Sequence, residues 1–348
     1  NFNQPIIVLY ADTPFVTKEL INSLHQKINS GSDICILGFS ADNPYGYGRL
    51  VQSSEGALTS IVEESEASET EKQIKNVNAG IMSFSGGSIE AILKKITPSN
   101  SKKEYFLTDV VSIGYKDNLN VDFILTDQKY VYGVNDRDQL AAAELLAQNY
   151  LRKNAMLAGV TMIAPETIFL QKDTTFEKDV TIEPNVIFGK GVSLAKNCYI
   201  KSFCYLEECS IGEDNIIGPF ARIRPNTITN KSVKIGNFVE VKKSNINQGT
   251  KINHLSYIGD AIIGENTNIG AGTITCNFDG YKKYTTKIGP GAFIGSNTSL
   301  IAPLSIGENA IIGAGSVITE DTPAESISLS RATQKTKIGG AKKFPKHQ

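Results

Sequence analysis

In the second half of the chain a branched aliphatic residue recurs at every sixth position, and a small residue usually follows it. The positions in phase are Ile211, Ile217, Ile223, Ile235 and Val241, then Ile263, Ile269, Ile288, Ile294, Leu300, Ile306 and Ile312, with a looser version at Phe176, Ile182, Phe188, Leu194 and Ile200. Such a hexapeptide repeat is typical of a parallel β-helix, in which three faces make one coil of about eighteen residues. The aliphatic side chain points inward, and the small residue allows the chain to turn the corner. The pattern predicts this fold for residues from about 170 to 319.

The repeat is interrupted twice, from Lys243 to Tyr257 and from Thr275 to Lys287. In a regular solenoid such interruptions are expected to be loops that leave one face, and solenoid loops often carry binding residues. We therefore expect a functional site near these two segments.

The first part of the chain alternates strand-like and helix-like segments, which is typical of an α/β domain. Asp12-Thr-Pro14 is expected to supply a strand-end carboxylate and the cap of a helix that carries Phe15, Val16, Leu20 and Leu24. The other expected elements are strands at Ile6–Tyr10, Ile34–Phe39, from Leu50, Ile61–Glu63, Val77–Met82 and Val121–Leu125, and a helix at Ile89–Ile96.

Residues 138–153 are rich in strong helix formers and contain neither Gly nor Pro, so they predict a helical arm between two domains. The resulting division is an α/β domain at 1–137, a helical linker at 138–155 and an all-β domain at 156–348. The tail from Ala332 is rich in lysine and is expected to be mobile. The chain opens on Asn1 and enters almost at once on a strand, so we expect that its natural N-terminus lies further upstream.

Composition limits the classes of partner. The formal net charge is −1, with 35 basic and 36 acidic residues, which gives no electrostatic reason to expect nucleic acid or an anionic membrane as a partner. Apolar runs are too short to span a membrane, and no secretory signal opens the chain. The five cysteines include no CxxC pair, which favours reduced thiols in the cytoplasm. Cys198 and Cys204 fall in the hexad region and are expected to be packing residues.

Histidine is scarce, with His25, His254 and His347 the three in the chain. His25 falls on a predicted surface helix and His347 is penultimate. His254 falls in the first interruption, where an isolated histidine is often only structural. A neutral imidazole, whose ordinary pKa is about 6.5, can also accept the proton of an attacking amine at neutral pH. His254 is therefore the candidate general base.

Four motifs occur in order and carry a family resemblance. They are Gly218-Pro-Phe-Ala-Arg-Ile-Arg-Pro225, Gly236-Asn-Phe-Val-Glu-Val-Lys-Lys243, His254-Leu-Ser-Tyr-Ile-Gly-Asp260 and Asn268-Ile-Gly-Ala-Gly-Thr-Ile-Thr-Cys-Asn-Phe-Asp-Gly280. Together they resemble the acetyltransferase half of the bifunctional bacterial N-acetylglucosamine-1-phosphate uridyltransferase/glucosamine-1-phosphate acetyltransferases. The resemblance extends over essentially the whole chain, and it implies a left-handed β-helix after a partial dinucleotide-binding-like nucleotidyltransferase domain.

For the β-helix, the resemblance implies a set of roles. His254 would deprotonate the glucosamine amine for attack on acetyl-CoA, and Glu240 is a candidate to orient it. Arg224 and Lys242 would clamp the sugar phosphate. Tyr257, Asn268 and Lys283 would also contact the sugar phosphate, and acetyl-CoA would lie against Ala271, Asn277, Phe278, Ser296, Ala314 and Arg331.

Simpler interpretations of these residues remain open. Arg224 and Lys242 occupy corner positions that could serve only surface solvation. Asn268, Ala271, Ser296 and Ala314 would each fit the repeat as structural residues. Phe278 departs from the family, which commonly has Tyr there, so a hydroxyl hydrogen bond is missing while ring packing against CoA remains possible.

For the first domain, the resemblance implies part of a uridyltransferase site. Asp12 and Asn135 match the two ligands of Mg²⁺, a cation that prefers hard oxygen donors. Gly48, Glu63, Asn78 and Asn135 match positions that hold the uridine-diphosphate sugar. A strand-end Asp is also often only a helix cap. The family's glycine-rich loop that cradles the UTP phosphates has no counterpart in this sequence, so we expect uridylyl transfer to be lost.

The implied function is therefore synthesis of UDP-N-acetylglucosamine, by acetyl transfer to glucosamine 1-phosphate followed by Mg²⁺-dependent uridylyl transfer from UTP. The resemblance also implies a homotrimer with acetyl-transfer sites between subunits. The alternative is a sugar-phosphate nucleotidyltransferase whose β-helix is purely structural or regulatory. A β-helix zinc enzyme of the carbonic anhydrase type would need three histidines, and the hexad region has one.

Overall fold

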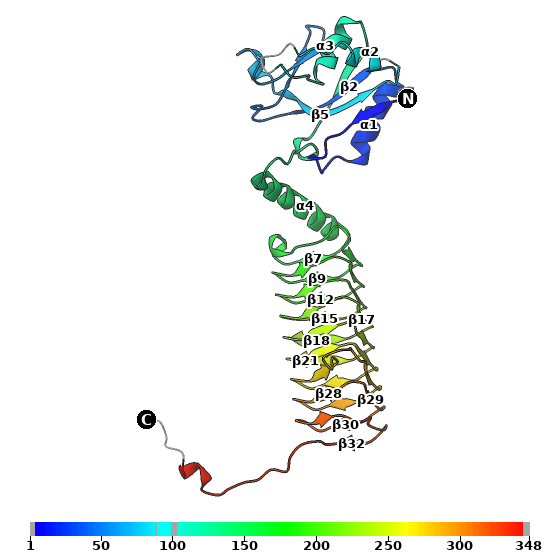
Figure 1. The fold of residues 1–348 in the computed structure, drawn as a ribbon, viewed down its shortest axis with the longest axis vertical. Coiled ribbons are helices and arrows are strands. Elements are labelled where there is room, and N and C mark those ends of the chain that lie inside the picture. The colour runs from blue at the N-terminus through cyan, green and yellow to red at the C-terminus, as the bar shows by residue number, and fades with distance from the viewer. Residues whose placement is uncertain (1–3, 88, 99–102, 344–348) are drawn as a thin grey trace. The chain divides into compact units, whose positions relative to one another are not determined.

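The computed structural model describes residues 4–87, 89–98 and 103–343, and His347 lies outside this range. The chain forms two compact units, residues 1–146 and 147–348 (Figure 1). Helix α4 (Arg137–Leu157) contains the boundary between them and is longer than the helix that the sequence predicts. Among the described helices, none combines the length and apolar character that a bilayer crossing would need.

The first unit is built on a mixed sheet. Its described strands follow the order β4-β3-β5-β2-β6, with β1 also paired to β5, and the β2–β6 pair is parallel. The strands are β1 (Ile6–Val8), β2 (Ile34–Ser40), β3 (Arg49–Gln52), β4 (Leu58–Val62), β5 (Asn76–Phe84) and β6 (Val121–Thr126), and the α-helices are α1 (Lys18–Asn29), α2 (Ile89–Leu93) and α3 (Asp109–Lys116). Short 3₁₀ turns lie at Glu71–Gln73 and Gln128–Tyr130. Buried aliphatic side chains on both faces of β2 hold the helices against the sheet.

The first helix begins later than the sequence predicts. The expected cap at Asp12-Thr-Pro14 is wrong, because the Thr13 hydroxyl donates to the Tyr10 carbonyl (2.9 Å) and closes a turn there. Thr17 caps α1 instead, and its side-chain oxygen accepts from the Leu20 N–H (3.4 Å). Asp12 is thereby left outside the helix.

The C-terminal half of α4 is tied to the start of the second unit. The Gln148 side chain donates to the Leu170 carbonyl (2.8 Å) and accepts from the Leu170 N–H (2.9 Å). Arg152 donates to the Ile168 carbonyl (2.9 Å). These bonds satisfy backbone groups at the end of the solenoid, where the strands have no further coil to pair with.

The second unit is a left-handed parallel β-helix whose coils stack in Figure 1. Its first face holds β7 (Thr161–Met162), β9 (Thr181–Ile182), β12 (Tyr199–Ile200), β15 (Ile216–Ile217), β18 (Lys234–Asn237), β21 (Lys251–His254), β24 (Asn268–Ile269), β27 (Phe293–Ile294), β30 (Ile311–Ile312) and β32 (Ile327–Ser328). Its second face holds β10 (Ile187–Phe188), β13 (Tyr205–Leu206), β16 (Arg222–Ile223), β19 (Glu240–Lys242), β22 (Tyr257–Gly259), β25 (Ile274–Cys276), β28 (Ser299–Ile301) and β31 (Val317–Ile318).

The third face holds β8 (Thr175–Phe176), β11 (Val192–Leu194), β14 (Cys209–Ile211), β17 (Thr227–Thr229), β20 (Asn245–Ile246), β23 (Ala261–Ile263), β26 (Thr286–Ile288) and β29 (Leu304–Ile306). A 3₁₀ turn at Pro165–Thr167 lies in the first coil, and another follows the last coil at Gly340–Lys343. The hexad aliphatics form one continuous core along the axis, and Ile217, Ile235 and Ile294 are fully buried in it.

The first interruption of the hexads is not a loop. The prediction for Lys243–Tyr257 is wrong, because this stretch forms β20 and β21 and buries Ile246 and Ile252. Ile246 follows Val241 by five residues rather than six, so one side of the coil is shorter and the chain stays on the solenoid. The second interruption is a loop, since residues 277–285 separate β25 from β26 and are closed by an antiparallel bridge between Phe278 and Lys283.

The corner between the first and second faces, here called edge 1–2, is made by residues with left-handed backbone. Among them, Phe238 has φ 54° and Leu255 has φ 50°. Phe203, Phe220 and Phe238 stack along this edge, with ring centroids 4.8 and 5.2 Å apart. Their rings and the Leu255 side chain are exposed, which leaves an apolar ladder on the surface.

Candidate active site

Edge 1–2 joins His254 to residues much further along the chain. The Gly272 N–H donates to the His254 carbonyl (3.3 Å), and the Asn297 N–H donates to the Ala271 carbonyl (2.7 Å). Two more hydrogen bonds extend this row along the edge. The Gly315 N–H donates to the Ser296 carbonyl (2.8 Å), and the Arg331 guanidinium donates to the Ala314 carbonyl (2.8 Å). His254, Ala271, Ser296, Ala314 and Arg331 therefore lie in one file along the same corner of successive coils.

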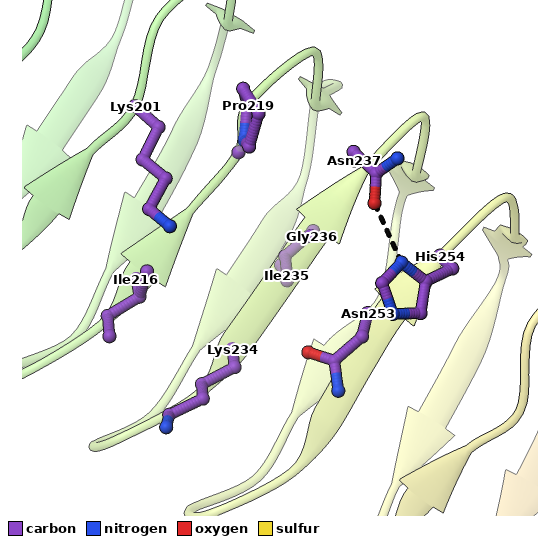
Figure 2. A pocket seen from close by; sticks show the side chains of 10 residues that line it. Lys201, Ile216, Pro219, Lys234, Ile235, Gly236, Asn237, Asn253 and His254 are labelled. Carbon is purple, nitrogen blue, oxygen red and sulfur yellow. Dashed lines mark hydrogen bonds between the residues drawn. The ribbon is translucent and has the colours of Figure 1, made fainter.

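His254 ends β21 on the first face and its side chain is exposed. Its Nδ1 lies 2.7 Å from Oδ1 of Asn237, which ends the neighbouring strand β18, and Figure 2 shows the two side chains turned toward each other. The ring borders a shallow groove of about 310 Å³ whose lining includes Lys201, Lys234 and Asn253. The histidine is thus held at one nitrogen and open to solvent at the other.

The cations predicted to clamp a phosphate gather on the second face. Lys242 ends β19, and Lys283 reaches it from the loop at 277–285. The Lys283 ammonium beside it lowers the pKa of Lys242, and burial and the Arg224 guanidinium lower it further. Holding these like charges together costs Coulomb energy, which an anion bound between them would offset.

Arg224 is held in this cluster by Glu240. Its Nη1 donates to Glu240 Oε1 (2.7 Å), and this bond holds the pKa of Arg224 above its ordinary value. The Nε of Arg224 is buried and has no hydrogen-bond partner among the described residues. Within this chain Glu240 lies on the second face against Arg224, while the imidazole of His254 bonds Asn237 on the first face. The expectation that Glu240 orients His254 stays a prediction.

Tyr257 and Gly259 shape the space beside Lys242. Tyr257 begins β22, and Gly259 is the register partner of Lys242 on the adjacent strand. A Cβ at Gly259 would collide with the Tyr257 hydroxyl and the Asn277 amide, so glycine leaves room for both side chains as they lie. Sequence reasoning missed this role, although Gly259 stands inside the quoted motif that begins at His254.

The structure does not bring all the predicted sugar-phosphate residues onto one face. Asn268 begins β24 on the first face, where its register partners are Lys251 and Phe293. Arg224, Lys242 and Lys283 are on the second face or in the loop that follows it. Within the described part of one chain, His254 and Asn268 are therefore separated by a corner from the cation cluster.

The two loop residues predicted to contact CoA, Asn277 and Phe278, differ in how far they are buried. Asn277 is buried, and its side-chain amide donates to Asp260 Oδ2 (2.6 Å), so that amide anchors the loop rather than facing solvent. Asp260 is itself buried and also pairs with Lys243 (3.0 Å). Phe278 is exposed. Sequence reasoning missed Asp260, which fixes the start of the loop that carries Lys283.

The five cysteines are free thiols. Cys198 and Cys204 lie in the core of the β-helix, as predicted, and burial raises the pKa of each to about 11. A thiol with so high a pKa is a poor nucleophile at neutral pH. Within the described residues, no group of three or more His, Cys, Asp and Glu side chains gathers as a metal site.

In the first unit, the predicted sugar-nucleotide residues Gly48, Glu63 and Asn78 come together. The Asn78 N–H donates to the Gly48 carbonyl (2.8 Å), and a Cβ on Gly48 would lie 3.3 Å from the Glu63 carboxylate. Thr108 donates to that carboxylate (3.0 Å). Gly48, Glu63 and Asn78 therefore lie in one region of the sheet, near β3, β4 and β5.

Asp12 and Asn135 are held near each other by the backbone. The Val134 N–H donates to the Asp12 carbonyl (2.9 Å), which places Asn135 next to this turn. Asp12 Oδ1 is buried and lacks a hydrogen-bond partner among the described residues. An unpartnered buried carboxylate oxygen, with the exposed Asn135 held nearby through this backbone bond, fits the hard-oxygen donor set that Mg²⁺ prefers.

Comparison with known proteins identifies the family of the chain. Residues 207–278 match the GMPPB C-terminal domain, and residues 285–320 match the bacterial transferase hexapeptide, six repeats. The bifunctional protein GlmU of Bartonella quintana is 46% identical over 339 residues, which cover 97% of this chain and 75% of that protein. The bifunctional protein GlmU of Agrobacterium fabrum is 45% identical over 336 residues, covering 97% and 74%.

Among solved structures, an Arabidopsis UDP-N-acetylglucosamine acyltransferase covers 47% of this chain and 70% of its own, at 18% identity and a TM-score of 0.33, a likeness too distant to bear on function. The GlmU relatives are far more similar and match nearly every part of the chain. The chain therefore belongs to the GlmU family of bifunctional acetyltransferase/uridyltransferase enzymes.

Proposed function

We propose that the second unit transfers the acetyl group of acetyl-CoA to the amine of glucosamine 1-phosphate, with His254 as general base. The observation that carries this proposal is the file along edge 1–2, which sets the imidazole at one end of a row of small residues that ends at Arg331. A thioester lying along this row would present its carbonyl carbon beside His254.

The chemical step then needs one proton acceptor. As the sugar nitrogen attacks the thioester carbonyl carbon, His254 Nε2 takes a proton from that nitrogen. The new C–N bond forms, the C–S bond breaks with its electron pair on sulfur, and CoA leaves as a thiolate. The imidazolium gives its proton to the thiolate, which restores the neutral base and yields N-acetylglucosamine 1-phosphate and CoA.

The cation cluster suits the 1-phosphate of the sugar. Arg224 offers the part of its planar guanidinium that does not bond Glu240, while Lys242 and Lys283 act as point charges. Tyr257 and Asn268 are proposed to hydrogen-bond the sugar phosphate. The excess of positive charge in the cluster would favour the phosphate over a neutral sugar.

Acetyl-CoA is proposed to lie along edge 1–2. Ala271, Ser296 and Ala314 have small side chains there, so a pantetheine arm can approach the backbone, and Arg331 would meet a CoA phosphate. Phe278 would pack against CoA through its exposed ring. Asn277 would act through the backbone of the loop, because its amide is bonded to Asp260.

We propose a homotrimer in which each acetyl-transfer site is formed between two copies of the chain. His254 and Asn268 are on the first face and the cation cluster is on the second, so the first face of one copy against the second face of the next would complete a site. The exposed apolar ladder along edge 1–2 offers surface that association can bury.

Subunit mixing tests the function and the shared site together. With glucosamine 1-phosphate held near the wild-type KM, the unmixed His254→Ala and Lys242→Met proteins should both transfer the acetyl group of acetyl-CoA far more slowly than the wild type, the first through a low kcat and the second through a raised KM. Trimers assembled from equal amounts of both should regain activity in about one quarter of their sites, because each site draws its base and its clamp from different copies.

The release of CoA thiol, dependent on both substrates, is the measurement. A wild-type chain that releases no CoA in the presence of both substrates would contradict the acetyl-transfer proposal and favour a β-helix that is only structural. Active wild-type protein without recovery in the mixed trimers would place the base and clamp of each site on one chain.

For the first unit we propose the part of the family's uridyltransferase site that holds the uridine-diphosphate sugar and Mg²⁺. In the family this site turns N-acetylglucosamine 1-phosphate and UTP into UDP-N-acetylglucosamine and pyrophosphate. Gly48, Glu63, Asn78 and Asn135 would hold the uridine-diphosphate sugar, and Asp12 and Asn135 would hold Mg²⁺, which neutralises phosphate charge when bound. The substrates are small molecules, and the five free cysteines fit a reducing cytoplasm.

Cation binding can be measured without turnover. In the presence of UDP-N-acetylglucosamine, Mn²⁺ used as a paramagnetic substitute should bind the wild-type chain, and Asp12→Ala should weaken binding by about tenfold or more. Asp42→Ala, an exposed carboxylate in the same unit, is the control and should bind as the wild type does. Equal Mn²⁺ affinity in wild type and Asp12→Ala would remove Asp12 from the ligand set.

A further inference from the structure

The partner of His254 is a neutral amide on the neighbouring strand. Asn237 and His254 are register partners of the parallel pair β18 and β21, 17 residues apart in the chain. Adjacent parallel strands lie about 4.8 Å apart, so two long polar side chains at paired positions on one face can meet. They do so here through Asn237 Oδ1 and His254 Nδ1, at 2.7 Å (Figure 2).

The backbone fixes both ends of this contact. A Cβ at Gly236 would collide with the Asn253 carbonyl, so glycine lets β18 lie close to β21 immediately before the pair. The residues that follow the pair, Phe238 and Leu255, both have left-handed backbone, and the Leu255 N–H donates to the Asn237 carbonyl (3.0 Å). Phe238 is stacked on Phe220. The backbone of these two residues therefore cannot slide along the edge without breaking these contacts.

An amide oxygen can only accept a hydrogen bond, so the Nδ1 that faces it must carry the proton. In the neutral ring the lone pair is then on Nε2, the nitrogen that Asn237 leaves open. We propose that Asn237 is the positioning residue of the acetyl-transfer base, holding His254 in the tautomer whose Nε2 accepts the proton of the sugar amine. This inference rests on the proposed function of His254.

The neutral character of Asn237 also matters. A carboxylate at this position would orient the ring equally well but would stabilise the imidazolium, and so would raise the pKa of the base. The charged groups facing His254 are lysines, since Lys201 and Lys234 line its groove and Lys251 begins its own strand. Across edge 1–2, the titratable and charged groups on the second face include Tyr257, the Arg224–Glu240 pair and Lys242, with Lys283 beside Lys242.

Two substitutions at position 237 separate orientation from charge. Asn237→Leu keeps the size of the side chain and removes the acceptor, so kcat for acetyl transfer should fall by about tenfold, the equivalent of one hydrogen bond, with KM for both substrates nearly unchanged. Asn237→Asp restores an acceptor and adds charge, so it should keep more activity than Asn237→Leu. Its acid limb in the pH profile of kcat/KM should move to higher pH by about one unit.

The tautomer itself can be read by ¹⁵N NMR of the histidine rings, with His254 assigned through His254→Ala. In the wild type at a pH where the ring is neutral, Nδ1 should be protonated and Nε2 unprotonated, and Asn237→Leu should shift this balance. Asn245→Leu, an exposed asparagine on the third face, is the matched control and should leave the NMR signals and the kinetics unchanged.

The outcomes are distinguishable. If His254→Ala retains full activity, the proposed base is wrong, whatever Asn237 does. If His254→Ala is inactive but Asn237→Leu has wild-type kcat and an unchanged tautomer, the base stands and the positioning role of Asn237 is overturned. A wild-type ring with its proton on Nε2 would also overturn it.

Discussion

Lys242→Met should raise the KM for glucosamine 1-phosphate by about 10- to 100-fold and leave kcat within a few-fold of wild type. A charge-assisted bond to a phosphate is worth about 1.5–3 kcal/mol, and losing one weakens binding of the phosphate in the ground state and the transition state alike. Methionine keeps the aliphatic length of the side chain, so packing on the second face is retained. Steady-state kinetics with glucosamine 1-phosphate as the varied substrate makes the measurement.

The matched control is Lys231→Met, because Lys231 is also a surface lysine of the β-helix but pairs with Glu213 and Asp214, remote from the cluster. Its KM should equal that of the wild type. An unchanged KM in Lys242→Met would mean that the phosphate binds elsewhere, and a loss confined to kcat would mean that Lys242 acts on the chemical step.

The lowered pKa of Lys242 gives this prediction a pH dependence. Lys242 attracts phosphate in its protonated form, and the nearby Lys283 ammonium lowers the pKa of Lys242. Affinity for the sugar phosphate should therefore decline with rising pH sooner than an ordinary lysine would cause. Lys283→Met removes the main cause of the shift, so this variant should bind more weakly at neutral pH, but its remaining affinity should persist to higher pH.

The hexad period was sufficient to predict the β-helix because each phase residue meets the same requirement, an aliphatic side chain inside a coil. Ile217 and Ile235 are fully buried on that account. The same period led to a wrong prediction of a loop at Lys243–Tyr257. One side of the coil there has five residues instead of six, which shifts the phase of the repeat while the chain stays on the solenoid. His254 was therefore predicted in a loop and lies at the end of a strand instead.

The types of side chain in the site could be predicted more readily than their partners. The motif resemblance assigned Arg224 and Lys242 to one phosphate clamp, and the structure places both near Lys283. It could not predict that Glu240 pairs with Arg224 or that Asn277 turns inward to Asp260, because these contacts depend on which face each strand end occupies. Asn237 carried no signal of its own, although its distance of one 17-residue coil before His254 could have identified it.

His254→Ala should have the largest effect on acetyl transfer, a loss of about 10²-fold or more in kcat, which is the usual contribution of a general base. The side chain is exposed at a strand end and is hydrogen-bonded to Asn237, so its removal should leave the fold and the clamp intact. KM for glucosamine 1-phosphate should accordingly stay close to the wild-type value. The control is His25→Ala, on helix α1 of the other unit, with wild-type kinetics expected.

The rate of the acetyl-transfer step in His254→Ala, followed in a single turnover with both substrates saturating, tests the account most directly. A rate at least about a hundredfold below wild type, with normal binding of glucosamine 1-phosphate, is the predicted result. A rate within a few-fold of wild type would contradict the account, because the proton of the sugar amine would then leave by a route that does not involve His254.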